Sequence, residues 1–304
     1  MYTGIRNMQY HSMQEYGEKH MRHTISDQNI AQFSEMLKNH ERSDVTIRKY
    51  TRDVLTFRQW LGEDKSFDKV RIMQYKEELQ KKYKTNSTNS MLSALNTFLL
   101  YMGWSECKVS TLKVQRSSFR TSQKDLTKEE FARLLKAARE KGKEQLLHIM
   151  ETIAATGIRV GELPYITVEA LNTGRAVVTL KRKTREILLP SPLCKVLRKW
   201  CHKKGIKSGS IFVTRNGNPV DRTNILHMMK SLAGAANVLC SKIFPHNLRH
   251  LFAVNYYENE KDIVRLADLL GHSNINTTRI YTMTTGEREL TSLNRVADTF
   301  ILVT

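Results

Sequence analysis

The first third of the chain carries apolar residues every three or four positions, which is the spacing of helices with one buried face. Ser26 and Ser43 stand where the first two helices would begin, as N-caps whose hydroxyl oxygen accepts a backbone N–H. We predict helices over 27–39, 44–61 and 70–82, and a fourth from near 86–88 to 102. No stretch here alternates in the manner of a strand, so the region is predicted to be a four-helix domain.

The pattern changes after residue 125. Thr127 and Glu130 match a capping box at the start of a helix, and a second helix over 144–156 stops at Gly157. Two short apolar segments, 176–180 and 186–189, flank a basic turn and predict a β-hairpin. Further helices are predicted over 192–203, 221–238, 245–257, 262–270 and 276–282, followed by a segment over 287–303 with an apolar end.

Between these two halves, residues 108–124 contain five cations, four serines and no acidic residue, which is typical of a basic linker. The chain is therefore predicted to be mainly α with a small antiparallel β-sheet, in two domains. We expect an N-terminal arm over 1–25, a helical domain over 26–107, the linker over 108–125 and a second domain over 126–304. A C-terminal tail begins at about 286.

Composition narrows the class of function. Lys and Arg number 49 against 30 Asp and Glu, a formal charge of +19, which favours a polyanionic partner. An anionic membrane surface is the alternative, but no lipid-anchor motif is evident and no apolar run approaches the ~18 residues of a membrane span. The N-terminus has no apolar signal segment and the four cysteines form no C-x-x-C pair. We therefore expect reduced thiols and a cytoplasmic protein.

Two basic regions are the candidate nucleic-acid contacts. A cationic linker suits a phosphate backbone that passes between two domains. A solvated helix face is the alternative for each candidate on the second helix. The candidates are Arg48, Lys49 and Arg52 on that helix, and Lys113, Arg116 and Arg120 in the linker.

The densest set of chemically active residues lies between residues 244 and 281. His246 and Arg249 project from one face behind Pro245, at a helix N-terminus that favours a phosphate. His272 ends a Leu-Leu-Gly-His run, and Tyr281 lies nine residues further on. A tyrosine, with a pKa of about 10, attacks phosphorus only where cations stabilise the phenolate and the phosphate.

His246 and His250 are four apart and also invite a zinc site. The glutamate of H-E-x-x-H is absent, however, and Arg249 between the two histidines would repel a cation. No metal is predicted.

A second arginine and a general acid come from elsewhere in the chain. Arg159 opens a turn after Gly157, and Glu162 can pair with it or orient it. Lys181 or Lys183 of the hairpin can protonate a leaving 5′ oxygen, because neighbouring cations lower a lysine pKa. A surface ion pair and a plain cationic turn are the alternatives. The same turn carries two further candidate DNA contacts, Arg182 and Arg185.

Together these parts resemble the tyrosine recombinase (phage integrase) family. The resemblance is carried by A-T-G-x-R-x-x-E-L around Arg159, the hairpin lysine, H-x-L-R-H from His246, L-G-H ending at His272, and Tyr281. It covers about residues 108–282 and is similar in flavour to the Xer-like and mobile-element integrases of bacteria. The helical first domain is similar to the family's core-binding domain in character only.

The resemblance implies a role for each of these residues. Tyr281 attacks the scissile phosphate and forms a 3′-phosphotyrosyl link, while Arg159 and Arg249 hold the non-bridging oxygens. His246 hydrogen-bonds the phosphate and accepts a proton, and His272 hydrogen-bonds the phosphate or positions the tyrosine.

Lys181 is the expected general acid for the departing 5′ hydroxyl. The family's hairpin usually carries a glycine beside this lysine, and here the turn reads Leu180-Lys181-Arg182-Lys183. Lys183 therefore stays open as the alternative. The N-terminal 25 residues are too few for a separate arm-binding domain, which favours a simple two-domain recombinase.

The resemblance implies a site-specific DNA recombinase or integrase that integrates or excises a mobile element. A chromosome-dimer-resolving Xer-type enzyme, a topoisomerase and a non-cleaving DNA-binding protein are the alternatives. The partners implied are double-stranded recombination sites and a homotetramer on two duplexes, with the C-terminal tail docked on a neighbouring protomer. No cofactor or membrane is expected, and the location is the bacterial cytoplasm, at the nucleoid when DNA is bound.

Overall fold

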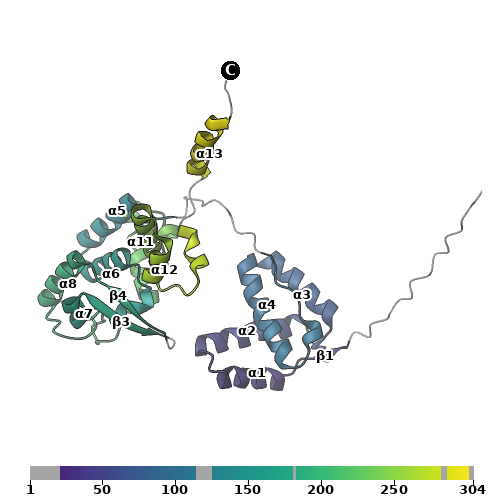
Figure 1. Cartoon of the computed structure of the whole chain (residues 1–304). Helices are drawn as coiled ribbons and strands as arrows, with labels where there is room; N and C mark the ends of the chain where they lie inside the picture. Colours follow the sequence, from purple (N-terminus) through teal and green to yellow (C-terminus); the bar gives the residue numbers. More distant parts are fainter. Residues whose placement is uncertain (1–20, 114–124, 181–182, 282–285, 301–304) are drawn as a thin grey trace, which may run out of the picture. The chain divides into compact units, whose positions relative to one another are not determined.

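The computed structural model describes residues 21–113, 125–180, 183–281 and 286–300 (Figure 1). The chain divides into two compact units, Met1–Arg116 and Ser117–Thr304, and the division falls within the predicted basic linker. Both units are mostly helical, and each contains one two-stranded antiparallel sheet. The predicted fold class, mainly α with a small antiparallel sheet, is confirmed.

The first unit contains the four predicted helices and the 3-10 turn η1 (Ser105–Cys107). Three of the helices begin with the cap that their sequence predicts or permits, because the side chains of Ser26, Ser43 and Asp68 accept backbone N–H groups. Their apolar faces meet in one core, where the rings of Phe33 and Phe98 make an edge contact. The helices are α1 (Asp27–Asn39), α2 (Asp44–Trp60), α3 (Lys69–Lys82) and α4 (Thr85–Tyr101).

A short sheet in this unit was not predicted. Strand β1 (His23–Thr24) pairs antiparallel with β2 (Ser66–Phe67). Two residues are too few to show an alternating pattern, so the sequence gives no sign of either strand. The adjoining Ile25 is buried at 1% exposure, and the chain therefore joins this core before the predicted boundary at residue 26.

The second unit is built around α6 (Glu144–Thr156), which contacts α5 (Lys128–Glu140), α8, α9 and α11. Most of α6 is buried because apolar residues occupy more than one of its faces. The predicted capping box of Thr127 and Glu130 opens α5, and Gly157 ends α6 in the left-handed conformation. The other helices are α7 (Val168–Thr173), α8 (Ser191–Lys204), α9 (Arg222–Lys230), α10 (Ala233–Ala236), α11 (Pro245–Glu260), α12 (Ile263–Leu270) and α13 (Gly286–Phe300).

The hairpin is confirmed but its turn is shorter than predicted. Strand β3 (Arg175–Leu180) pairs with β4 (Lys183–Leu188) in a register that sets Leu180 opposite Lys183. Lys183 and Arg185 thus lie in a strand, and the predicted five-residue basic turn is wrong. The start of β4 was not recognised because charged residues occupy its first positions. The buried Val178 and Ile187 show which strand positions face the core.

Two further expectations were wrong in detail, and two short elements were not predicted. The single helix predicted over 221–238 is two helices, α9 and α10. The helix predicted over 276–282 is two 3-10 turns, η5 (Ile275–Thr277) and η6 (Arg279–Tyr281). Helix α7 and the 3-10 turn η3 (Val160–Tyr165) were not predicted, since six residues give too little periodicity.

In the part of the chain that the structure describes, no helix is both long and apolar enough to cross a bilayer. All four thiols are free. Cys240 is exposed, whereas the other three cysteines are buried.

Candidate active site

Arg249 is the most enclosed charged residue of the second unit. Its side chain projects from the second turn of α11 and is 1% exposed. Nη1 donates to the carbonyl of Gly157 (2.5 Å), and Nη2 donates to the carbonyl of Leu270 (2.7 Å) and to His272 Nε2 (2.9 Å). The two carbonyls lie at the C-terminal ends of α6 and α12, where they have no intrahelical partner and the helix dipole favours a cation.

The charge of Arg249 has neutral partners in these three contacts. Its Nε is buried and has no hydrogen-bond partner among the described residues. Burial, and then the charge of Arg159, lower the pKa of Arg249 to about 10. The guanidinium is still protonated at neutral pH, so the site holds a partly uncompensated positive charge that suits an anion.

His272 follows the left-handed Gly271 that ends α12. Since Arg249 donates to Nε2, the ring proton lies on Nδ1, which donates to Thr278 Oγ1 (2.8 Å). Burial, and then the charges of Arg249 and Arg159, lower the pKa of His272 to about 4. His272 is therefore a neutral ring held from both sides in one orientation.

Tyr281 ends the 3-10 turn η6 and is 3% exposed. Its ring lies nearly parallel to that of His272, with 6.3 Å between centroids and an interplanar angle of 13°. The ring of His250 meets the Tyr281 ring edge-on, with 5.0 Å between centroids. Two histidines thus fix the ring of the predicted nucleophile.

Arg159 stands at the N-terminus of η3 with an exposed guanidinium, 45% of the side chain being accessible. Its backbone N–H donates to Glu162 Oε2 (2.7 Å), its Nη1 to Glu162 Oε1 (3.3 Å) and its Nη2 to the carbonyl of Gly271 (3.2 Å). The predicted pairing of Arg159 with Glu162 is present. The last contact brings Arg159 to the Leu270–His272 turn, more than a hundred residues away in the chain.

Glu162 is buried and takes three kinds of donor. Burial alone raises a carboxyl pKa, but hydrogen bonds from Arg185 and from the Arg159 backbone outweigh it and hold the pKa of Glu162 below its usual range. The carboxylate is therefore ionised and oriented.

His246 is exposed at the first turn of α11. Partial burial, and then the charges of Arg249 and Arg159, lower its pKa, so the ring is neutral at neutral pH. The charges that act on His246 place it in the field of the same two arginines that surround His272.

The two candidate lysines belong to the β3–β4 hairpin. Lys181 and Arg182 lie outside the described residues, and for Lys183 the backbone alone is described, as the first residue of β4. The choice between Lys181 and Lys183 as general acid stays open.

The other predicted DNA contacts are unevenly placed. In the first unit, Lys49 and Arg52 both bond the buried carboxylate of Asp53, at 2.6 and 3.2 Å, and Arg52 remains 71% exposed. Arg48 and Lys113 are exposed, while Arg116 and Arg120 lie outside the described residues. Arg185 points inward and its side chain is 17% exposed.

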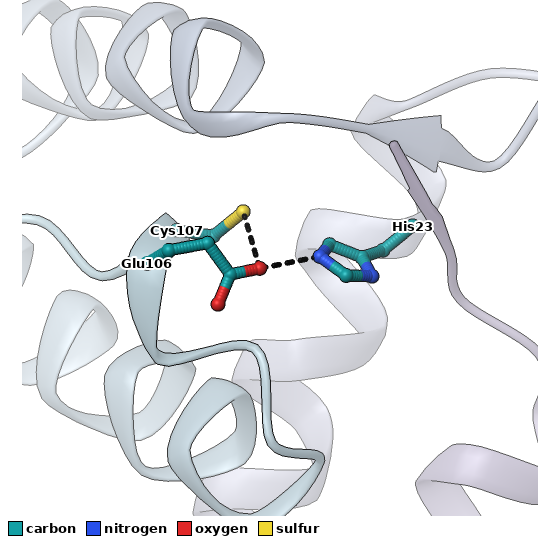
Figure 2. A group of neighbouring side chains, drawn as sticks. All are labelled: His23, Glu106 and Cys107. Atoms are coloured by element: carbon teal, nitrogen blue, oxygen red, sulfur yellow. Dashed lines mark hydrogen bonds and ion pairs between the residues drawn. The ribbon is translucent and has the colours of Figure 1, made fainter. Parts of the chain in front are cut away.

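One group of possible metal ligands occurs in the described parts of the chain, and it belongs to the first unit. His23, Glu106 and Cys107 offer ligand atoms within 4.8 Å of one another (Figure 2). His23 Nε2 lies 2.5 Å from Glu106 Oε1, and its ring stacks on Trp104. Burial, and then the charge of Glu106, raise the pKa of Cys107 to about 11, which disfavours the thiolate that a metal requires. The cluster fits an anchor for strand β1 better than a metal site.

The site has two contributors whose roles the sequence did not reveal. Gly157 gives the carbonyl that holds Arg249, and a side chain there would collide with Phe252. His250 packs on Tyr281 and its Nδ1 lies 3.6 Å from Asp125 Oδ1. The second histidine of H-x-L-R-H was the available signal, but a ring contact cannot be inferred from spacing.

Two family models match the chain. The phage integrase family covers residues 124–288, and the phage integrase N-terminal SAM-like domain covers residues 30–106. The chain belongs to the phage integrase family. The recognition of a tyrosine recombinase from its motifs is therefore confirmed, and the chemistry of this family is site-specific breaking and rejoining of DNA.

Similar proteins include recombinases of several kinds. Tyrosine recombinase XerA of Thermococcus kodakarensis is 29% identical over 85% of this chain and 91% of its own. XerD of Haemophilus influenzae is 27% identical over 81% and 89%, and TnP I resolvase of Bacillus thuringiensis is 26% identical over 83% and 93%.

Solved structures show the same fold. XerH recombinase in a post-cleavage complex with a palindromic difH substrate aligns with a TM-score of 0.66 and 19% identity, covering 91% of this chain and 90% of that one. A lambda integrase tetramer bound to a Holliday junction aligns with a TM-score of 0.68 and 17% identity, covering 87% and 78%.

Proposed function

We propose that this chain is a site-specific DNA recombinase in which Tyr281 is the nucleophile. The observation that carries the proposal is the convergence of Arg159, Arg249, His272 and Tyr281, from four separate segments, on the Leu270–His272 turn. Preorganised donors and positive charge are what a phosphate needs as negative charge builds up in the transition state. An uncompensated buried arginine favours the same ligand.

The proposed reaction has two balanced transfers. The phenol oxygen of Tyr281 attacks phosphorus and forms a Tyr–P bond as the P–O5′ bond breaks. The phenol proton passes to His246, whose lowered pKa leaves it free to accept a proton at neutral pH. Lys181, with Lys183 as the alternative, protonates the leaving 5′ oxygen. The 3′-phosphotyrosyl link keeps the energy of the phosphodiester, so rejoining by a partner strand's 5′ hydroxyl requires no cofactor.

In this scheme the two arginines hold the non-bridging oxygens. His272 is a positioning residue, because its Nε2 accepts from Arg249 and its ring lies parallel to Tyr281. Its pKa of about 4 keeps it neutral, and a charged ring would repel Arg249 instead of accepting from it.

The C-terminal helix α13 supports assembly into a tetramer on two duplexes. Its apolar residues recur at spacings of three and four on one helix face, and they are between 55% and 80% exposed. We propose that this face docks on a neighbouring protomer. The residues are Leu290, Leu293, Val296 and Phe300.

Double-stranded recombination sites are the proposed partner. The exposed cations Arg48, Arg52 and Lys113, together with a net charge of +19, favour phosphate contacts. Similarity to both XerA and TnP I resolvase is compatible with integration or excision of a mobile element and with Xer-type resolution. We place the enzyme with its DNA, in the cytoplasm and at the nucleoid.

A nicked suicide duplex bearing the protein's site tests the nucleophile. Wild type should form a covalent adduct visible on a denaturing gel, and Tyr281→Phe should form none. Tyr257→Phe, on the same domain, is the matched control and should retain the adduct. An adduct that persists in Tyr281→Phe would show that Tyr281 is not the nucleophile. The absence of an adduct with wild type would contradict the proposed recombinase function. Relaxation of one plasmid without recombination of two sites would point to a topoisomerase.

A further inference from the structure

Arg185 lies at a junction of three elements, although the proposed reaction gives it no task. From strand β4 its side chain makes a forked contact with Glu162, with Nε donating to Oε1 (3.1 Å) and Nη2 donating to Oε2 (2.6 Å). Its Nη1 donates to the carbonyl of Leu269 near the end of α12 (2.7 Å). One planar fork thus joins the hairpin, the turn that carries Arg159 and the helix that leads to His272.

The turn after α12 is shaped to admit this arginine. Gly271 has φ +62°, and a Cβ built on it would lie 2.7 Å from Arg185 Cδ and 3.0 Å from Nε. The carbonyl of the same glycine accepts from Arg159 Nη2. Arg185 therefore packs directly against the residue that holds Arg159 on one side and precedes His272 on the other.

The charges of Glu162, Arg185 and Arg159 give this arrangement a function. The side chain of Glu162 is buried, at 3% exposure, and a buried carboxylate is unfavourable unless a cation pairs with it. Arg185 takes the short, two-point contact, at 2.6 and 3.1 Å, which leaves Arg159 a single longer side-chain contact at 3.3 Å. Without Arg185, the carboxylate would draw Arg159 into that two-point contact and away from the exposed side where a phosphate would bind.

We propose that Arg185 is a positioning residue for strand cleavage. It neutralises Glu162 and supports the Gly271 turn, so that the Arg159 guanidinium remains available and His272 keeps its orientation. The proposal rests on the function proposed above. The sequence suggested that Arg185 contacts a DNA phosphate. The proposed role is instead to position the residues that hold the phosphate.

The first test compares cleavage rates on a saturating suicide duplex. Arg185→Gln should slow adduct formation by ~100-fold, because small misplacements of phosphate-holding groups have effects of that size. Arg185→Lys should retain a charge but lose the fork, and should slow it by ~10-fold. Arg175→Gln is the matched control: Arg175 lies on the same hairpin and pairs with Glu186 at the surface, and its loss should change the rate less than about twofold.

DNA affinity separates the two roles of Arg185. A positioning residue should leave the Kd of the intact duplex within about twofold of wild type, whereas a phosphate contact would weaken binding and lower its salt dependence. A rate that matches the Arg175→Gln control, or one reduced only in proportion to the unfolded fraction measured by thermal unfolding, overturns the proposal.

A 5′-bridging phosphorothiolate at the scissile position identifies the group through which Arg185 acts. Its sulfur leaves without being protonated, so this substrate restores variants that lack only the general acid. The Arg185→Gln defect should persist on it, because the affected group is Arg159. Full rescue would mean that Arg185 acts through a hairpin lysine, and it would overturn the proposal.

A double-mutant cycle with Gly271 tests whether Arg185 acts through its packing against the Gly271 turn. Gly271→Ala should slow cleavage in the wild-type background, since its methyl group displaces Arg185, and should add little in an Arg185→Ala background. Additive effects contradict the packing link. If wild type itself forms no adduct, the recombinase function fails and this inference fails with it. A wild-type adduct with an unaffected Arg185→Gln variant removes this inference alone.

Discussion

The two arginines proposed to grip one phosphate are held in opposite ways. Arg249 is 1% exposed and held by two helix-end carbonyls and a neutral histidine, whereas the side chain of Arg159 is 45% exposed and shares Glu162 with Arg185. The buried arginine is fixed before DNA arrives. The exposed Arg159 keeps N–H donors available for the ligand, and contacts with Glu162 and the Gly271 carbonyl set its position. The proposed phosphate site thus combines one enclosed arginine with one exposed arginine.

The largest effect is expected from the buried arginine. Arg249→Lys should slow adduct formation by ~10³-fold, because an ammonium cannot reach both carbonyls and the phosphate at once. Arg159→Lys should cost ~10²-fold, since an exposed, longer-range contact tolerates a point charge better. Single-turnover cleavage of the suicide duplex measures both, with Arg175→Lys as the exposed control. Equal losses for the two arginines would break the comparison.

The buried Arg249 also depends on Gly157, whose carbonyl accepts from its Nη1. A Cβ there would lie 2.3 Å from Phe252 Cδ1, on a backbone with φ +65°, so Gly157→Ala should lower the free energy of unfolding by ~3 kcal/mol. Gly142 has the same φ of +65° and nothing within 4 Å, so Gly142→Ala measures the backbone strain alone, ~1 kcal/mol. Denaturant unfolding gives both values. Similar losses at the two glycines would show that Phe252 yields readily.

The pKa of His272 sharpens the comparison through pH. The folded-state pKa of about 4 lies below the ordinary 6.5, so the unfolded chain binds this proton more tightly. Stability from a neutral His272 is therefore fully present above about pH 6.5 and is lost as pH falls toward 4. His272→Gln should show a smaller loss of unfolding free energy between pH 7 and 4.5 than wild type. Parallel pH profiles would assign the acid loss to other groups.

The smallest effect is expected for an exposed arginine outside the site. Arg52 is 71% exposed in the first unit, and Arg52→Gln should weaken DNA binding a few-fold and reduce the salt slope by ~1. The cleavage rate at saturating DNA should not change, in contrast to Arg159→Lys. A changed rate at saturation would place Arg52 in the chemistry.

Much of the fold could be predicted because its signals are local. The caps of Ser26, Ser43 and Thr127 and the stop at Gly157 act within a few residues, and their helices begin or end as predicted. Strand β1 and the 3-10 turn that ends at Tyr281 could not be predicted, since each is shorter than the window in which a period can be recognised. The start of β4 was missed because charged residues occupied strand positions.

The sequence by itself determined the family, the order of the motif residues and the helices that carry them. It identified Arg159 and Arg249 as a pair, but treated them as equivalent. Only the tertiary structure decided that Arg249 is enclosed by the ends of α6 and α12, and that Arg185 turns inward to Glu162. The physical reason is that burial and charge pairing depend on neighbours 21 to 92 residues away, and the spacing along one chain does not record them.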